Sequence, residues 1–158
     1  MQYLLMALFG ALIVGADQLT KYLVVENIPL YGSVDAVPGL FHLTYVQNTG
    51  AAFSMLRGAQ WLFALIFLVL TVAVVWDMVK KVMPFTRLER WLVVCIYAGG
   101  LGNMIDRVRL GYVVDMIEVE FIRFPVFNVA DCFITCGCVL LIAHLVLCNK
   151  EFWEDEKK

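Results

Sequence analysis

Four long apolar runs dominate the chain, and shorter polar or turn-forming segments separate them. Each run is about as long as a helix that crosses the hydrocarbon core of a bilayer. The pattern therefore predicts four transmembrane helices in one integral membrane domain covering residues 1–158. The expected spans are 4–25, 61–79, 88–106 and 129–148, and the expected outer loops are 26–60 and 107–128.

The two longer connecting segments show strand-like patterns rather than helical ones. Phe41, Leu43 and Tyr45 alternate with His42 and Thr44, which is typical of a short strand. The segment 111–128 is rich in β-branched and aromatic residues, which also favour a strand. The predicted fold class is an all-α membrane protein with a small β element.

Composition supports the membrane assignment and adds an orientation. Of the 158 residues, 62% are hydrophobic and 16% are charged, and the mean hydropathy is +0.82, far above that of an ordinary soluble domain. A net charge of -2 without a basic face makes nucleic acid an unexpected partner. Lys80, Lys81, Arg87 and Arg90 crowd one short connection, so the positive-inside rule places that connection and both termini in the cytoplasm.

Acidic residues at the membrane boundary are the candidates for chemistry. Asp106, Asp115 and Asp131 lie in the segment 99–131, between two apolar runs, with Asn103, Arg107 and Asn128 around them. An ionisable residue in or beside a bilayer is costly and needs a partner or a function.

Two of the acids also have ordinary structural explanations. Asp131 stands at the N3 position after Asn128, as in a capping box. Asp17 stands four residues before Lys21, in the favourable orientation for a helical ion pair.

The chain lacks the residue patterns that metal-dependent or serine-dependent catalysis requires. The five cysteines lie inside apolar runs without CxxC spacing, and the two histidines, His42 and His144, form no HExxH motif, so we expect no metal and no cofactor. Ser33 and Ser54 have no base at a useful spacing. The fourth span brings Asp131 back to the depth of Asn103 and Asp106, and Asp115 lies on the connection, close enough in sequence to face Asp131. Two neighbouring carboxylates that share a proton can activate water and protonate a carbonyl. A protease built from this chain would be an aspartic one.

Five segments in order, DQLTK, NTGAAFS, GNMIDR, VVDMI and FNVAD, resemble the conserved boxes of lipoprotein signal peptidase, also called signal peptidase II. The resemblance covers nearly the whole chain. It implies a multi-pass bacterial inner-membrane aspartyl endopeptidase that removes signal peptides from diacylglyceryl prolipoproteins, cutting before the lipidated cysteine near the outer face. It also implies four helices with an extracytoplasmic β-cradle and a short outer helix.

The resemblance assigns roles to individual residues. It makes Asp115 and Asp131 catalytic, and it makes a second set supporting or substrate-binding residues: Asp17, Asn48, Gly50, Asn103, Asp106, Arg107 and Asn128. For Asp106 we expect a structural ion pair. The expected partners are the prolipoprotein substrate and membrane lipid, and the expected oligomeric state is a monomer.

The helix dipole favours Asp131 as the ionised base and Asp115 as the protonated acid. Two alternatives use the same residues differently. A proton-coupled transporter would relay protons through the aspartates, and a noncatalytic scaffold would use them only to join helices.

Overall fold

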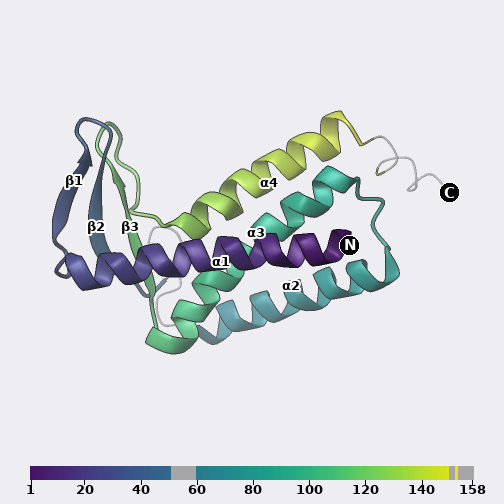
Figure 1. The fold of residues 1–158 in the computed structure, drawn as a ribbon, viewed down its shortest axis with the longest axis horizontal. Helices are drawn as coiled ribbons and strands as arrows, with labels where there is room; N and C mark the ends of the chain where they lie inside the picture. Colours follow the sequence, from purple (N-terminus) through teal and green to yellow (C-terminus); the bar gives the residue numbers. More distant parts are fainter. Residues whose placement is uncertain (51–59, 150–151, 153–158) are drawn as a thin grey trace.

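Four helices and a three-stranded sheet make up the fold in the computed structural model, which describes residues 1–50, 60–149 and 152 (Figure 1). The helices extend away from the sheet, which lies at one end of the molecule. The predicted fold class, a helical membrane protein with a small β element, is confirmed. The helices are α1 (Gln2–Asn27), α2 (Gln60–Lys80), α3 (Arg87–Leu110) and α4 (Val129–Leu147), and the strands are β1 (Ser33–Val37), β2 (Phe41–Asn48) and β3 (Val113–Val119).

Three of the helices, α1, α2 and α4, are long and apolar enough to cross a membrane. Helix α3 differs because charged residues occupy both of its ends, including Glu89 and Arg90 at the start and Asp106 and Arg107 near the end. It packs against each of the other three helices. Its passage through the membrane stays a prediction.

Capping residues define where α3 and α4 begin. Thr86 and Glu89 form a capping box at the start of α3, in which each side chain accepts a hydrogen bond from the other residue's backbone N–H. Asn128 and Asp131 form the same arrangement at the start of α4. Gly111 ends α3 in the left-handed conformation, at φ 80°, which glycine adopts without strain.

The sheet is antiparallel, in the order β1-β2-β3. Its inner side packs on the end of α1, where Val24 and Ile28 contact a cluster of Tyr45, Val114 and Met116. Val46 of β2 lies opposite Asp115 of β3. This packing fixes the depth at which Asp115 stands relative to the helices.

The short outer helix implied by the resemblance is not seen among the described residues of the two outer segments, and residues 51–59 lie outside those residues. The strand β1 was not predicted. All five of its residues are exposed. Polar and apolar residues alternate only from Ser33 to Ala36, and Gly32, Pro38 and Gly39 beside the strand favour turns instead.

Candidate active site

A cleft of about 730 Å³ lies where β2 and β3 meet α3 and α4. Both Asp115 and Asp131 line it, and most of the remaining wall is apolar. Its other lining residues include Asn48, Asn103 and Arg107, the segment 124–127, Phe63 of α2, and Cys132, Ile134, Thr135 and Cys136 of α4.

Asp115 is almost completely buried, with 2% of its surface exposed. Its Oδ2 accepts a hydrogen bond from Asn48 Nδ2 at 2.9 Å, and its Oδ1 accepts one from Asn128 Nδ2 at 2.7 Å. Burial raises the pKa of this carboxyl to about 6, and the charge of Asp131 raises it too, while the two asparagine donors and Lys21 lower it. Asp115 therefore takes up a proton far more readily than an exposed aspartate.

Asp131 stands in the first turn of α4 and is half-buried. Its Oδ1 accepts a hydrogen bond from Asn103 Nδ2 at 2.8 Å, and its Oδ2 accepts one from the backbone N–H of Asn128 at 3.2 Å. The positive end of the helix dipole favours a negative charge at this position. The two hydrogen-bond donors and the dipole favour the ionised form of Asp131, and its burial opposes that form.

Asn128 links the two acids and is fully buried. Its Oδ1 accepts a hydrogen bond from Asp131 N at 2.9 Å, so its Nδ2 is directed toward Asp115 Oδ1 and Asn103 Oδ1. A single side chain therefore fixes the start of α4 and donates to the carboxylate on β3.

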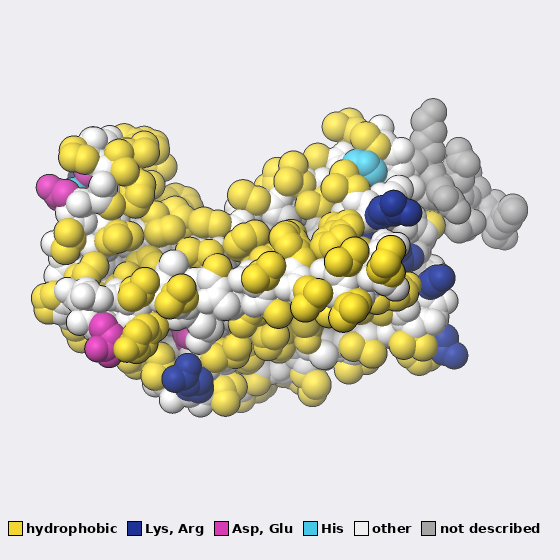
Figure 2. Space-filling view, viewed as in Figure 1, with side chains coloured by type: hydrophobic (Ala, Val, Ile, Leu, Met, Phe, Trp, Pro, Cys, Tyr) yellow, Lys and Arg dark blue, Asp and Glu magenta, His cyan; other side chains and the backbone are white. Residues whose placement is uncertain are grey.

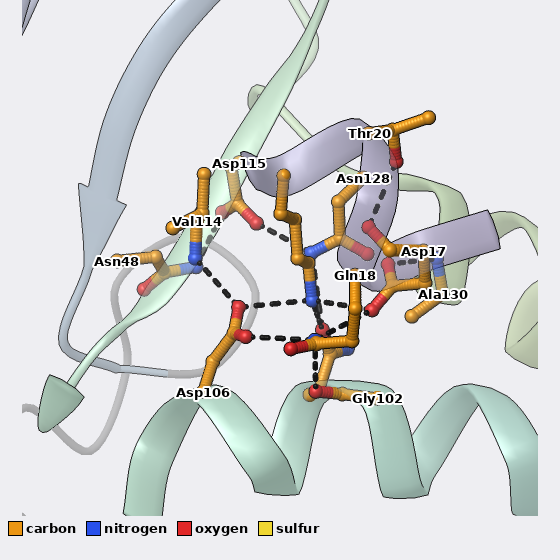
Figure 3. Close-up of polar contacts among 12 residues, drawn as sticks. Asp17, Gln18, Thr20, Asn48, Gly102, Asp106, Val114, Asp115, Asn128 and Ala130 are labelled. Atoms are coloured by element: carbon orange, nitrogen blue, oxygen red, sulfur yellow. Dashed lines mark hydrogen bonds and ion pairs between the residues drawn. The ribbon is translucent and has the colours of Figure 1, made fainter. Parts of the chain in front are cut away.

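A second polar cluster lies beside the cleft, built from α1 and α3 (Figure 3). Asp17 and Asp106 are both buried, and Lys21 Nζ lies 2.9 Å from Asp17 Oδ2 and 3.0 Å from Asp106 Oδ2. Gln18 Nε2 adds a hydrogen bond to Asp106 Oδ1 at 2.9 Å. The expected ion pair of Asp17 with Lys21 is present, and Asp106 joins it.

Arg107 lines the cleft and holds the residues Gly50 and Gln60. Its guanidinium donates to the Gly50 carbonyl at 2.7 Å and to Gln60 Oε1 at 3.3 Å, and it lies 4.0 Å from the centre of the Phe63 ring. Gly50 N in turn donates to Asn48 Oδ1 at 2.9 Å. Arg107 is thereby connected to the asparagine that holds Asp115.

All nine residues that the sequence proposed for the site fall in this one region: Asp17, Asn48, Gly50, Asn103, Asp106, Arg107, Asp115, Asn128 and Asp131. Sequence reasoning did not assign Gln18, Gln60 or Phe63 to the site, and it gave Lys21 only a helical ion pair. Gln18 and Lys21 stand inside the DQLTK segment, so that segment held the signal. Within residues 1–50, 60–149 and 152, no three His, Cys, Asp or Glu side chains are grouped so that they could hold a metal ion.

Comparison with known proteins decides the family. The model of the family described as signal peptidase (SPase) II matches residues 9–147. The chain belongs to the signal peptidase II family. Membership makes it a peptidase, and with its apolar helices it is a multi-pass membrane protein.

Relatives and solved structures agree with this family assignment. A lipoprotein signal peptidase of Streptococcus thermophilus is 44% identical over 147 residues, covering 91% of this chain and 89% of the relative. One of Enterococcus faecalis is 41% identical over 146 residues, covering 90% and 88%. A solved structure described as a bacterial membrane enzyme, at 2.3 Å resolution, is 31% identical and superimposes with a TM-score of 0.85, covering 92% of this chain and 90% of the other. The fold of that membrane enzyme is thus shared over nearly the whole of this chain.

Proposed function

We propose that this protein is an aspartic endopeptidase that removes signal peptides from diacylglyceryl prolipoproteins, cutting on the N-terminal side of the lipidated cysteine. The names of its relatives support the substrate class. One observation carries the aspartic mechanism: two carboxylates from different elements, β3 and α4, line one cleft, and Asn128 contacts both, through its side chain at Asp115 and through its backbone N–H at Asp131.

The environments of the two acids suggest different roles. Ionised Asp131 takes a proton from water as the water oxygen attacks the scissile carbonyl carbon, and protonated Asp115 gives its proton to the carbonyl oxygen. When the tetrahedral intermediate collapses, the C–N bond breaks, the leaving nitrogen takes the proton from Asp131, and one hydroxyl group of the intermediate returns its proton to Asp115 as the carbonyl forms again, so both acids regain their starting states. The products are a carboxyl group on the signal peptide and a free α-amine on the lipidated cysteine.

The remaining site residues position these groups. Asn48 and Asn128 donate to Asp115, and Asn103 donates to Asp131. Arg107 lines the cleft that a substrate backbone would occupy, and it donates to the Gly50 carbonyl. The apolar wall formed by α4 and the segment 124–127 suits an apolar signal peptide and its lipid.

We place the protein in the bacterial inner membrane with both termini in the cytoplasm and the cleft near the outer face. The basic α2–α3 connection supports this orientation. The enzyme acts as a monomer in this scheme, because every residue assigned to the site comes from one chain.

The test is cleavage of a diacylglyceryl prolipoprotein peptide in detergent by Asp115→Asn and Asp131→Asn. Each variant should lose activity by at least about 1000-fold, because the remaining carboxylate lacks its acid or base partner. Asp35→Asn is the matched control, since its carboxylate is 75% exposed on β1. Gel filtration and thermal unfolding establish that each variant is folded.

A folded Asp115→Asn or Asp131→Asn variant that cuts at near wild-type rate would refute the two-aspartate mechanism. Proton-coupled transport or a noncatalytic scaffold would then have to be tested with the same variants.

The same scheme requires a two-limbed profile of kcat/KM against pH. Activity should fall at high pH as Asp115 loses its proton near pH 6, and at low pH as Asp131 becomes protonated. A profile with one limb contradicts the assignment of an acid and a base.

A further inference from the structure

The residue directly before each proposed catalytic aspartate donates its backbone N–H to a buried carboxylate. Asp17 Oδ1 accepts a hydrogen bond from Ala130 N at 3.0 Å, directly before Asp131. Asp106 Oδ2 accepts one from Val114 N at 3.1 Å, directly before Asp115 (Figure 3). Asp17 of α1 therefore fixes the position of α4 beside Asp131, and Asp106 of α3 fixes the position of β3 beside Asp115. Asp115 and Asp131 are called the dyad below.

Lys21 joins these two backbone contacts. Its ammonium group contacts Asp17 Oδ2, Asp106 Oδ2 and, at 2.9 Å, Asn103 Oδ1. An ammonium has three N–H donors, so all three are used, and Lys21 is only 3% exposed. The Lys21 ammonium thus contacts both Asp17, which holds the backbone beside Asp131, and Asp106, which holds the backbone beside Asp115.

The same ammonium fixes the orientation of Asn103. Because Lys21 can only donate, Asn103 must present its oxygen to it, which leaves Asn103 Nδ2 to donate to Asp131. Asn128 Nδ2 also donates to Asn103 Oδ1, at 3.1 Å. If the Asn103 amide turned over, its oxygen would face the Asp131 carboxylate and the two groups would repel.

We propose that Lys21 is a positioning residue of the reaction, which sets the separation of Asp115 and Asp131 through Asp17 and Asp106 and directs the Asn103 amide toward Asp131. The proposal rests on the proposed function. It goes beyond a helical ion pair, because an ion pair that only joined α1 to α3 would have no effect on the chemistry of a folded enzyme.

The experiment compares Lys21→Met, Lys21→Arg and Thr20→Val in the detergent assay, with kcat and KM measured separately. Lys21→Met should lower kcat by about 100-fold, as expected for a small misplacement of catalytic groups, and change KM by less than about threefold. Lys21→Arg should recover a large part of kcat. Thr20→Val is the control, because the Thr20 hydroxyl donates to carbonyls of its own helix, at Ala16 and Asp17.

The pH profile gives a readout that a purely structural role would not move. The charged groups that face Asp115 from the packed elements are Asp131 of α4, Lys21 of α1, and Asp106 and Arg107 of α3. The positive charge of Lys21 lowers the pKa of Asp115, so Lys21→Met should move the alkaline limb of kcat/KM to higher pH. Lys21→Arg keeps the charge and should leave the limb in place.

Lys21→Met leaves the buried carboxylates of Asp17 and Asp106 without their cation, and the variant could lose activity because it does not fold. A second variant therefore tests the proposal without this change in charge. The double variant Lys21→Met/Asp106→Asn keeps the net charge of the cluster unchanged, and the amide oxygen introduced at position 106 can still accept from Val114 N. This variant should fold and still show the loss in kcat.

A folded Lys21→Met or double variant with kcat within about threefold of wild type, or with a loss confined to KM, would overturn the proposal. The Asp115→Asn and Asp131→Asn variants distinguish a failure of the Lys21 proposal from a failure of the two-aspartate mechanism. If they are inactive while folded Lys21→Met is active, only the role of Lys21 is wrong. If they remain active, the dyad itself is wrong.

Discussion

The Asp115 carboxyl group is held where its charged form is disfavoured. It is buried on β3 and faces the charge of Asp131, and only two asparagine donors and the charge of Lys21 offset this. An acid that must carry a proton near neutral pH needs such surroundings. The same surroundings reduce the stability of the folded protein when that proton is lost.

We expect Asp115→Asn to gain stability relative to wild type as the pH rises. The folded pKa of about 6 lies above the ordinary value of 3.8, so the folded state binds the proton more tightly than the unfolded state does. The wild type therefore loses stability between about pH 4 and pH 6, by up to about 3 kcal/mol, because each pH unit between the two pKa values corresponds to about 1.4 kcal/mol. The asparagine variant lacks this loss.

The measurement is the difference in Tm between Asp115→Asn and wild type in detergent at pH 4.5 and pH 7.5. The difference should favour the variant more at pH 7.5. In Asp115→Asn, the new NH2 group faces the NH2 group of Asn48 or Asn128, which lowers the stability of the variant. This loss of stability does not depend on pH. Asp35→Asn is the exposed control. A difference that is equal at the two pH values would show that Asp115 does not titrate as described.

Close approach of three helices places the supporting acids next to the dyad. A Cβ atom on Gly102 of α3 would lie 2.5 Å from Asp17 Oδ2, and a Cβ on Gly99 would lie 2.6 Å from the Ala130 carbonyl oxygen. Small residues at such crossings let membrane helices pack closely. Here they bring α1 and the start of α4 within hydrogen-bonding distance of each other.

Gly102→Ala should impair both stability and activity. The added methyl group pushes against the Asp17 carboxylate, and overpacking of this kind costs about 1–3 kcal/mol. Displacement of Asp17 also loosens its contacts with Ala130 N and Lys21, so kcat should fall by about 10-fold or more.

Gly15→Ala on α1 is the matched control, because a Cβ there meets no atom within 4 Å. It should leave cleavage unchanged and, through its better helix propensity, keep or slightly raise Tm. Equal behaviour of Gly102→Ala and Gly15→Ala in both assays would argue against tight packing at Gly102.

The elements also show what the sequence could and could not predict. Contacts within one segment follow from spacing, so the Asp17–Lys21 pair and the Asn128–Asp131 cap were predictable. The contact of Lys21 with Asp106 joins residues far apart in the chain and depends on how α1 and α3 are rotated, which no local pattern specifies. The boxes of the resemblance indicated which residues gather, but not which atoms meet.

At the scale of the whole molecule, the two ends of the helical bundle differ in charge. Hydrophobic side chains cover much of the helical face, and most of the visible Lys and Arg side chains lie at the end away from the sheet (Figure 2). That end contains the α2–α3 connection, while the segment that follows β3 carries exposed apolar residues such as Phe121, Ile122 and Phe124. A bilayer would therefore hold the sheet near one surface and the basic connection at the other.

We expect the sheet to face outward and the α2–α3 connection to face the cytoplasm. Asp35→Cys on β1 should react with a membrane-impermeant maleimide in intact protoplasts, and Arg87→Cys at the start of α3 should react only after permeabilisation, because positive charge is retained on the cytoplasmic side. Mass spectrometry of the labelled peptides distinguishes these sites from the five native cysteines. The reverse pattern would place the cleft at the cytoplasmic surface. A diacylglyceryl cysteine exposed on the outer surface could not then reach Asp115 and Asp131, so the labelling experiment also tests whether the proposed substrate has access to the proposed dyad.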